Sequence, residues 1–214
     1  EHMFIPREDF LDQISVQSFQ VKRRTEAIVS LREIISICEI TLMEEDYLKA
    51  LLYNVRLAGS NTYPYRDCKI YLCRTDPNEL ILGQTFVLKS KLMSILTDVQ
   101  KIFRSGFAKI PAYKVYGTIS GKEGLYLAHY VPPIIEEHSG NKVSIDGTHR
   151  QFLTRGVGTT IETVVVRCPK TPLPFGLTEW GNIVPCDVKP EKTKRYVDLR
   201  PEYFRDLSSV GIDG

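Results

Sequence analysis

The stretch that decides the fold is Val143-Ser144-Ile145-Asp146-Gly147-Thr148-His149-Arg150, in which an apolar strand pattern breaks into a turn. Gly147 lets the backbone turn sharply and come close to a ligand. The residues after it predict a short helix that carries Arg150 and ends near Gly156. The sequence therefore predicts a strand, a tight turn and a helix N-terminus in direct succession.

This turn combines residue types that bind phosphate. The amides of Thr148, His149 and Arg150 begin the predicted helix, where free donors and the helix dipole stabilise an anion. Arg150 adds a planar cation that grips phosphate oxygens. Asp146 is placed to accept a proton from a substrate hydroxyl or to hold Mg²⁺. A purely structural turn stays open, in which Asp146 caps the helix, Arg150 only pairs with it, and His149 only bonds to neighbouring backbone.

The residues around the turn predict a sheet. Gly140-Asn141 lies between two apolar runs and predicts a hairpin. Ile161–Val166 ends in an almost unbroken apolar run, which is typical of a strand inside a sheet, and Lys69–Cys73 predicts another strand. We therefore expect an α/β (α+β) domain with a small mixed sheet and flanking helices.

The segment between the strand at 69–73 and the hairpin contains one predicted helix. Asp76–Glu79 predicts a turn, and the mixed apolar run Leu80–Leu88 has Gln84 in its middle. Ser90 is expected to cap a helix that continues to Gly106.

The N-terminal third is expected to be helical. Apolar residues recur at helical spacing from Ile28 to Cys38. Thr41 and Glu44 fit a capping box in front of a second apolar stripe, Tyr47–Val55. A polar connection at 60–67 then predicts a boundary.

Three regions follow from these patterns. Residues 1–62 are the N-terminal helical region, and residues 63–167 form the α/β domain with an inserted ribbon at 107–130. Residues 168–214 are rich in proline and predict an irregular strap that closes with a short helix starting at Pro201.

Charge and cysteine content narrow the class of protein. The formal net charge of +2, from 28 basic and 26 acidic residues, makes a strongly basic DNA-coating protein unfavourable. The five cysteines lack the spacing of a zinc site, so we expect buried free thiols and a reducing cytosol. Neither a membrane-spanning apolar stretch nor a signal-peptide pattern is present, and we expect a cytoplasmic protein that does not bind a membrane.

The order of these motifs resembles the ParB/sulfiredoxin-like superfamily over roughly residues 70–167. The resemblance rests on Asp76-Pro77-Asn78-Glu79-Leu80 with Gln84 ahead of a helix, the Pro-Pro-Ile-Ile strand at 132–135, the turn at 143–150, and Gly158 before the last strand. It implies that the turn binds nucleotide phosphates through Gly147, Thr148, His149 and Arg150, with Gln84 beside them.

The turn is most similar to the branch that contains free-serine kinases, with Ile-Asp-Gly-x-His-Arg. Sulfiredoxins carry a catalytic cysteine where Thr148 stands, so that activity is not expected. ParB clamps carry Gly-Glu-Arg-Arg, bind CTP and continue into a helix-turn-helix, which the Pro-rich tail does not suggest. The kinase resemblance implies catalytic roles for Asp146 and His149. Its glutamate base is replaced by Gln84, so either Glu79 substitutes, Asp146 is the base, or the chain is not a kinase.

The expected function is therefore a nucleotide-dependent phosphotransferase that acts on a small hydroxylated metabolite, with ATP or ADP (or CTP) and Mg²⁺. A non-catalytic nucleotide- or DNA-associated binding module is the alternative, supported by Gln84 and by basic residues between Lys189 and Arg195. A ParB-like nuclease ranks last, because no acidic cluster accompanies Asp146.

Overall fold

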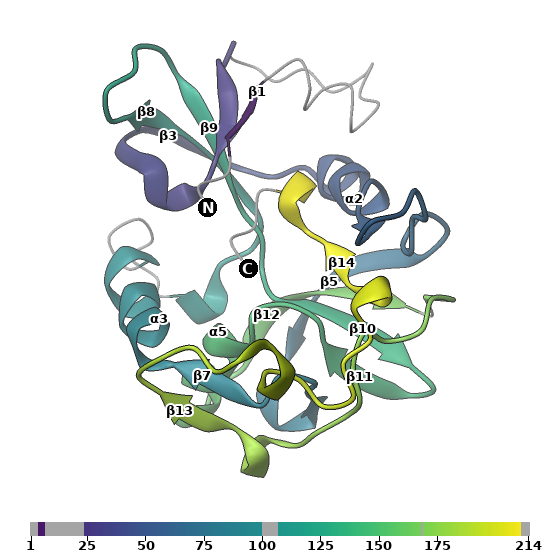
Figure 1. Cartoon of the computed structure of the whole chain (residues 1–214). Coiled ribbons are helices and arrows are strands. Elements are labelled where there is room, and N and C mark those ends of the chain that lie inside the picture. The colour runs from purple at the N-terminus through teal and green to yellow at the C-terminus, as the bar shows by residue number, and fades with distance from the viewer. Residues whose placement is uncertain (1–3, 7–23, 100–106, 168, 211–214) are drawn as a thin grey trace. The chain divides into compact units, whose positions relative to one another are not determined.

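A computed structural model of the chain describes residues 4–6, 24–99, 107–167 and 169–210 (Figure 1). The protein belongs to the mixed α/β (α+β) class, as the sequence predicts. Its contacts divide it into two units. Unit 1 comprises Glu1–Asp67, Ala112–Val131 and Arg205–Gly214, and unit 2 comprises Cys68–Pro111 and Pro132–Phe204.

Unit 2 is built on a five-stranded mixed sheet in the order β5-β12-β10-β11-β6. The strands β10 and β12 are parallel, as are β11 and β6, and the other two pairs are antiparallel. Most residues of β10 and β12 are buried, which explains the apolar runs Ile134–Ile135 and Val164–Val166 within them. The strand bounds are β5 Lys69–Thr75, β6 Leu80–Ile81, β10 Ile134–His138, β11 Asn141–Ser144 and β12 Ile161–Arg167.

The predicted hairpin is confirmed. His138 pairs with Asn141, and a two-residue turn joins β10 to β11. Ser139 and Gly140 have φ angles of 49° and 84°, the positive values that a type I′ hairpin turn needs at both central positions. Because this turn sets the register, it fixes where β11 ends and where the Asp146 turn begins.

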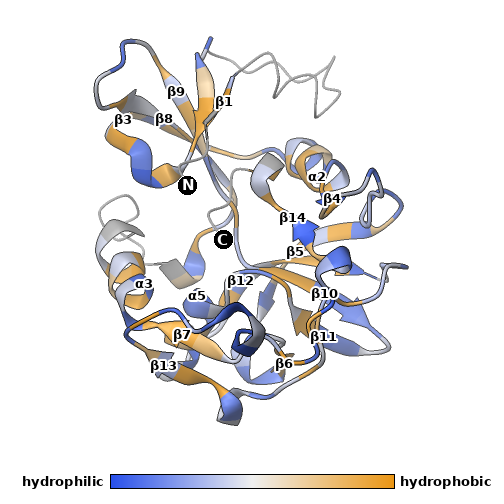
Figure 2. Ribbon diagram, in the orientation of Figure 1, coloured by the Kyte–Doolittle hydropathy of each residue, from blue (hydrophilic) through white to orange (hydrophobic). Residues whose placement is uncertain are grey.

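Unit 2 also contains the helices α3 (Lys89–Ser94) and α5 (Thr148–Gly156) and a parallel strand pair. The pair joins β7 (Phe86–Leu88) to β13 (Val184–Cys186), and the buried β7 is apolar in Figure 2. The prediction that Ser90 caps the helix is wrong, because α3 starts two residues earlier than that cap implies, with Leu88 at the N-cap. A π-helical turn, η3 (Ile95–Val99), follows α3, and the rest of the predicted helix lies outside the described residues.

The proline-rich segment crosses unit 2 as an irregular strap of short 3₁₀ turns: η5 (Trp180–Asn182), η6 (Lys192–Lys194) and η7 (Pro201–Tyr203). The predicted short helix at Pro201 is therefore present, with Pro201 in its first turn. Single bridges tie the strap to the segment between β6 and β7, at Leu82 with Thr178 and at Gln84 with Tyr196. These bridges and the β7–β13 pair hold the strap along residues 82–88, directly before α3.

Unit 1 corrects the prediction of an N-terminal helical region. Its sheet has the order β1-β2-β9-β8-β3. The residues expected to form a helix at 28–38 lie in β2, in the 3₁₀ turn η1 (Leu31–Glu33) and in β3. The run Ile34–Leu42 is rich in β-branched residues, which lose side-chain freedom in a helix and suit a strand. The strand bounds are β1 Phe4–Pro6, β2 Ala27–Val29, β3 Ile34–Leu42, β8 Tyr113–Ile119 and β9 Tyr126–Tyr130.

The predicted ribbon at 107–130 forms its antiparallel pair in unit 1, where β8 pairs with both β9 and β3. A short 3₁₀ turn, η4 (Phe107–Lys109), precedes it in unit 2. The ribbon is therefore part of a sheet with the N-terminal strands.

The second N-terminal stripe is confirmed as a helix, α2 (Glu45–Tyr53), which buries Tyr47, Leu48, Leu51 and Leu52. The predicted capping box is wrong, because Thr41 lies in β3 opposite Lys114 and the N-cap residue is Glu44. Instead, a capping box joins Ser30 and Glu33 at η1. The remaining elements of unit 1 are the short pair β4 (Arg56–Leu57) and β14 (Arg205–Asp206) and the turn η8 (Ser208–Val210).

In the described part of the chain, no helix is long and apolar enough to cross a membrane.

Candidate functional site

The predicted strand-turn-helix at Asp146 is present. Gly147 is the N-cap of α5 and has a φ of 86°, in the left-handed region. A β-carbon at this position would lie 2.6 Å from Cβ of Pro133, so only glycine fits. The first helical hydrogen bond at this end runs from the amide of Gln151 to the carbonyl of Gly147, at 3.0 Å. The first turn of α5 thus begins directly after β11.

Asp146 and Arg150 form an ion pair across this turn. Nη2 of Arg150 lies 3.1 Å from Oδ2 of Asp146, and the two side chains are 12% and 14% exposed. Within the described residues, no side chain caps α5, so Asp146 does not act as the helix cap. One part of the purely structural alternative therefore holds, because Arg150 pairs with Asp146 one helical turn away. The other part, an Asp146 helix cap, does not.

His149 holds two segments together. Its Nε2 accepts a 2.9 Å hydrogen bond from the amide of Leu88, so the proton of the neutral ring lies on Nδ1. Burial, with a smaller contribution from the nearby cations Lys91, Arg150 and Lys189, lowers the pKa of His149 to about 4. At neutral pH His149 is an uncharged acceptor at Nε2 and an uncharged donor at Nδ1.

The side chain of Gln151 forms hydrogen bonds to residues on both sides of the Ile145 position, a role that the sequence did not predict. It is completely buried and its Oε1 accepts a 2.6 Å hydrogen bond from Oγ of Ser144. Its Nε2 donates to the carbonyl of Asp146, at 3.4 Å. The end of β11 and the start of α5 are therefore tied to one side chain. A polar residue on the buried face of a predicted helix was the available signal.

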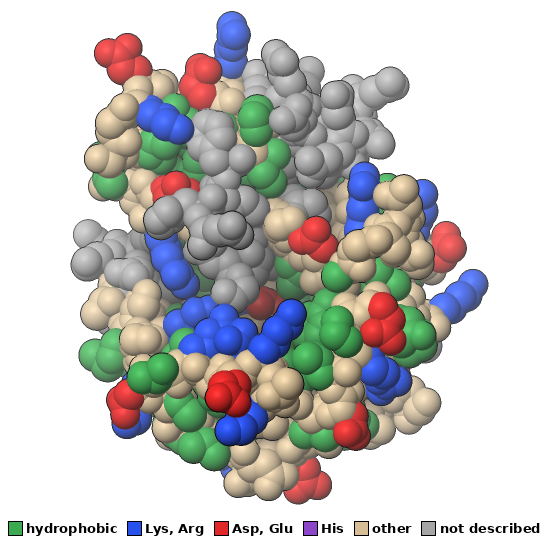
Figure 3. All heavy atoms as spheres, in the orientation of Figure 1, with side chains coloured by type: hydrophobic (Ala, Val, Ile, Leu, Met, Phe, Trp, Pro, Cys, Tyr) green, Lys and Arg blue, Asp and Glu red, His purple; other side chains and the backbone are tan. Residues whose placement is uncertain are grey.

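Basic residues from three segments lie close enough to His149, in the first turn of α5, for their charges to act on its ring. Lys91 lies in the first turn of α3, and Lys189 follows β13; both lie near enough to His149 to depress its pKa. The parallel pairing of Cys186 with Leu88 sends both chains in the same direction, and Lys89 forms a 3.0 Å ion pair with Asp187. Figure 3 shows Lys and Arg side chains gathered on the face over α5 and β7. We call Lys91, Arg150 and Lys189 the cation cluster.

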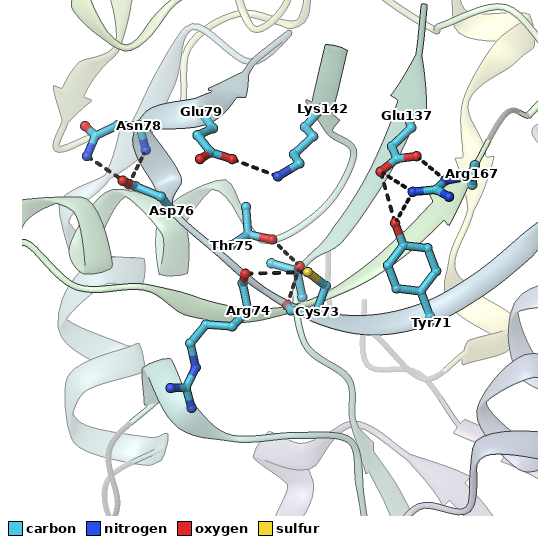
Figure 4. A network of polar contacts seen from close by, with 11 residues as sticks. Tyr71, Cys73, Arg74, Thr75, Asp76, Asn78, Glu79, Glu137, Lys142 and Arg167 are labelled. Carbon is cyan, nitrogen blue, oxygen red and sulfur yellow. Dashed lines mark hydrogen bonds and ion pairs between the residues drawn. The ribbon is translucent and has the colours of Figure 1, made fainter. Parts of the chain in front are cut away.

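Glu79 is not brought to this turn. Its carboxylate forms a 2.7 Å ion pair with Nζ of Lys142. Lys142 lies opposite Leu80, near the amino ends of the parallel strands β11 and β6. Asp146 follows the carboxyl end of β11, about 13 Å further along at ~3.3 Å per residue. Figure 4 shows Glu79 and Lys142 pointing toward each other on the sheet. Glu79 therefore belongs to a different polar group.

That group also contains a three-residue cluster on the same sheet. Oε2 of Glu137 lies 2.6 Å from Nε of Arg167, and the hydroxyl of Tyr71 donates to Oε1 of Glu137 at 3.0 Å (Figure 4). The Arg167 guanidinium lowers the pKa of Glu137. These contacts link β5, β10 and β12.

Gln84 lies on the strap side of the site. Its Nε2 donates to the carbonyl of Phe86, and its backbone is bridged to Tyr196. Burial raises the pKa of Tyr196, and the charge of Asp146 raises it further. Tyr196 therefore lies near Asp146, and the strap contributes to this side of the turn.

The remaining candidate functional groups are metal ligands and cysteine thiols. Among the described residues, no group of three or more His, Cys, Asp or Glu side chains is arranged to hold a metal ion. Cys38, Cys68, Cys73 and Cys186 are free thiols, and Cys168 lies outside the described residues. Cys38 is exposed and the other three are only partly buried, so the expectation of buried thiols is wrong for all four described cysteines.

Comparison with known proteins adds no relative: no family model, no curated protein and no solved structure matches this chain.

Proposed function

We propose that unit 2 binds the phosphate groups of a nucleotide at the first turn of α5 and transfers a phosphoryl group to a small hydroxylated metabolite. The observation that carries the proposal is the cation cluster around a helix N-terminus whose cap residue is a glycine. Helix amides and cations together stabilise a phosphate. The resemblance of the turn to the free-serine-kinase branch of the ParB/sulfiredoxin-like superfamily supports the same function.

Arg150 is the residue best suited to hold the phosphate. Its guanidinium is held beside α5 by Asp146, and a phosphate oxygen can replace the carboxylate as its partner. The pair is largely buried, so Asp146 needs a new partner, such as a substrate hydroxyl or Mg²⁺, once a phosphate oxygen takes its place on Arg150. Phosphate binding would thus release Asp146 from Arg150.

Asp146 is then the candidate proton acceptor. In the proposed step the substrate oxygen bonds to the terminal phosphorus while the bond from that phosphorus to the leaving phosphate breaks. The hydroxyl proton passes to Asp146. Phosphoryl transfer needs mainly positioning and charge neutralisation, which Arg150 and the amides of the turn can provide. His149, neutral at pH 7, can donate from Nδ1 and does not serve as the cation.

The site offers one side-chain ligand for magnesium, the carboxylate of Asp146. Mg²⁺ in phosphoryl-transfer enzymes is commonly held by one or two carboxylates and by phosphate oxygens, and Asp146 supplies one carboxylate. The ion would neutralise charge on the phosphates. Holding it would also favour the release of Asp146 from Arg150.

A thermal-shift panel with ATP, ADP, CTP, GTP and inorganic phosphate, each with magnesium, tests the binding. Ligand at about a hundred times its dissociation constant stabilises the folded protein by roughly 2.7 kcal/mol, which is a shift of several degrees. We expect ATP or ADP to raise the unfolding midpoint of the wild type but not of Arg150→Met. Lys142→Met is the control, because it removes a cation that pairs with Glu79, and it should keep the shift. No shift with any nucleotide would contradict the proposal.

Turnover is tested separately by ³¹P NMR of nucleotide consumption over a panel of hydroxylated metabolites. Asp146→Ala should abolish consumption without abolishing the nucleotide-dependent thermal shift. Full activity in Asp146→Ala would remove Asp146 from the chemistry.

A non-catalytic binding module is the second candidate. It is favoured by the position of Glu79, which is paired with Lys142 at the far end of β11, and by Gln84, an amide that cannot accept a proton. This candidate predicts nucleotide-dependent shifts without consumption of any nucleotide. A DNA-associated form, using the strap residues from Lys189 to Arg195, predicts affinity that falls steeply with salt. A shift with CTP alone would favour the partition-type module.

Four free thiols among the described residues are consistent with the proposal that the protein acts in the reducing cytoplasm.

A further inference from the structure

The backbone of the strap is tied to the segment before β7 on both sides of Tyr196. The residue after it, Val197, donates its amide to the carbonyl of Gly83 at 3.3 Å. The residue before it, Arg195, accepts at its carbonyl from the amide of Thr85 at 3.0 Å. Tyr196 is therefore held at a fixed place along the strap.

Two aromatic side chains hold the ring of Tyr196. Phe175 stacks on its face, with centroids 5.6 Å apart and planes 7° apart, and Phe204 meets it edge-on at 5.1 Å. Gly83 makes room for this stack, because a β-carbon there would overlap the ring of Phe175. Both contacts use the ring alone, so a phenylalanine at this position would keep them.

The hydroxyl of Tyr196 is an available donor. No residue that the structure describes forms a hydrogen bond with it, and the side chain is only half-buried. Burial raises the pKa of Tyr196, the charge of Asp146 acts in the same direction, and the charge of Arg195 opposes the rise. At neutral pH the hydroxyl therefore keeps its proton, near the Asp146 carboxylate.

We propose that Tyr196 is a positioning residue, whose hydroxyl donates a hydrogen bond to Asp146 when a phosphate oxygen takes the place of that carboxylate on Arg150. This inference rests on the proposed function and names the group that holds its proton acceptor. The carboxylate is only 14% exposed, so losing the guanidinium without gaining a donor would be costly. One neutral donor leaves lone pairs of Asp146 open to the hydroxyl of the substrate.

A double-mutant cycle tests the inference, with inorganic phosphate as the probe, no magnesium, and calorimetry on the full chain. Tyr196→Phe removes only the hydroxyl and should weaken phosphate binding about tenfold, as for a lost hydrogen bond to a charged group. When Asp146→Asn is already present, Tyr196→Phe should change the dissociation constant by less than about twofold, because no charge is left to stabilise. A purely structural role of the hydroxyl would give the same change in both backgrounds.

The matched control is Tyr71→Phe, which removes a hydroxyl that donates to Glu137 in the other polar group. It should leave phosphate binding unchanged in both backgrounds. Because the hydroxyl of Tyr196 has no partner among the described residues, Tyr196→Phe should also leave the unfolding midpoint of the unliganded protein nearly unchanged.

The outcomes separate this inference from the proposed function. If Tyr196→Phe has the same effect in both backgrounds, or no effect in either, Tyr196 does not act on Asp146, although phosphate still binds. Phosphate that binds only with magnesium would also overturn the inference, because the metal would then be the new partner of Asp146. If phosphate does not bind under either condition, or binds equally well to Arg150→Met, the inference fails together with the proposed function.

Discussion

The amide of Leu88 donates a hydrogen bond of 2.9 Å to Nε2 of His149. One residue is the N-cap of α3 and the other lies in the first turn of α5. A backbone amide can only donate, so this contact requires His149 to present an unprotonated Nε2. The histidine therefore joins the starts of the two helices while the ring is neutral.

Removing this acceptor should cost stability. Leu88 is buried, so His149→Ala leaves its amide without the histidine partner, and we expect a loss of about 1–3 kcal/mol in the free energy of unfolding. His149→Gln keeps an acceptor near the same place and should recover part of the loss. Urea denaturation measures both variants. Equal stability of the alanine variant and the wild type would show that the hydrogen bond does not hold the two helices together.

Gly147→Ala should be strongly destabilising. The alanine β-carbon would meet Pro133 at 2.6 Å and would have to adopt a φ of 86°. Both effects act on the folded state, and together we expect a loss of about 2–4 kcal/mol. Gly156→Ala, at the other end of α5, is the matched control because a β-carbon there has nothing within 4 Å. That control should be neutral or slightly stabilising, since alanine favours a helix. Similar midpoints for the two variants would contradict this account of the turn.

Asp146→Asn should strengthen the binding of inorganic phosphate. The substitution removes the charge that pairs with Arg150 and leaves the guanidinium to the anion. We expect a several-fold lower dissociation constant by calorimetry, with a steeper dependence on salt. Asp187→Asn removes one negative charge from the same unit but breaks the pair with Lys89 instead. If both variants change the phosphate affinity equally, the net charge of the unit controls the binding, and the Asp146–Arg150 pair does not.

The local parts of this site could be predicted from sequence, and the long-range parts could not. The hairpin at Gly140 and the turn at Gly147 depend on glycines that reach positive φ angles, so a few adjacent residues specify them. The prediction of a helix at 28–38 is wrong because the short spacing of its apolar residues also fits strands, and the partner of β3, β8, lies about 80 residues away. The cation cluster depends on the pairing of β7 with β13, which no local pattern reveals.

The stability of the protein should fall as the pH drops from about 6.5 toward 4. His129 is completely buried: its Nδ1 donates to the carbonyl of Val210 at 2.9 Å, and its Nε2 accepts from the hydroxyl of Tyr47 at 2.8 Å. Burial, opposed by the hydrogen bond to Val210 and aided by the charge of Lys114, lowers the pKa of His129 to about 4. The unfolded chain, with a histidine pKa near 6.5, binds the proton first, so protonation favours unfolding in this window.

For His129 alone the expected loss between pH 7 and pH 5 is about 2 kcal/mol, from ~1.4 kcal/mol for each unit of pKa difference. His149, whose pKa is also about 4 but whose ring is less buried, should add a smaller loss. Urea denaturation across this pH range measures the slope, and NMR of the imidazole protons assigns it. In His149→Gln the slope should decrease but persist, because His129 still contributes. A free energy of unfolding that stays constant from pH 7 to pH 5 would mean that His129 is not held neutral in the folded protein.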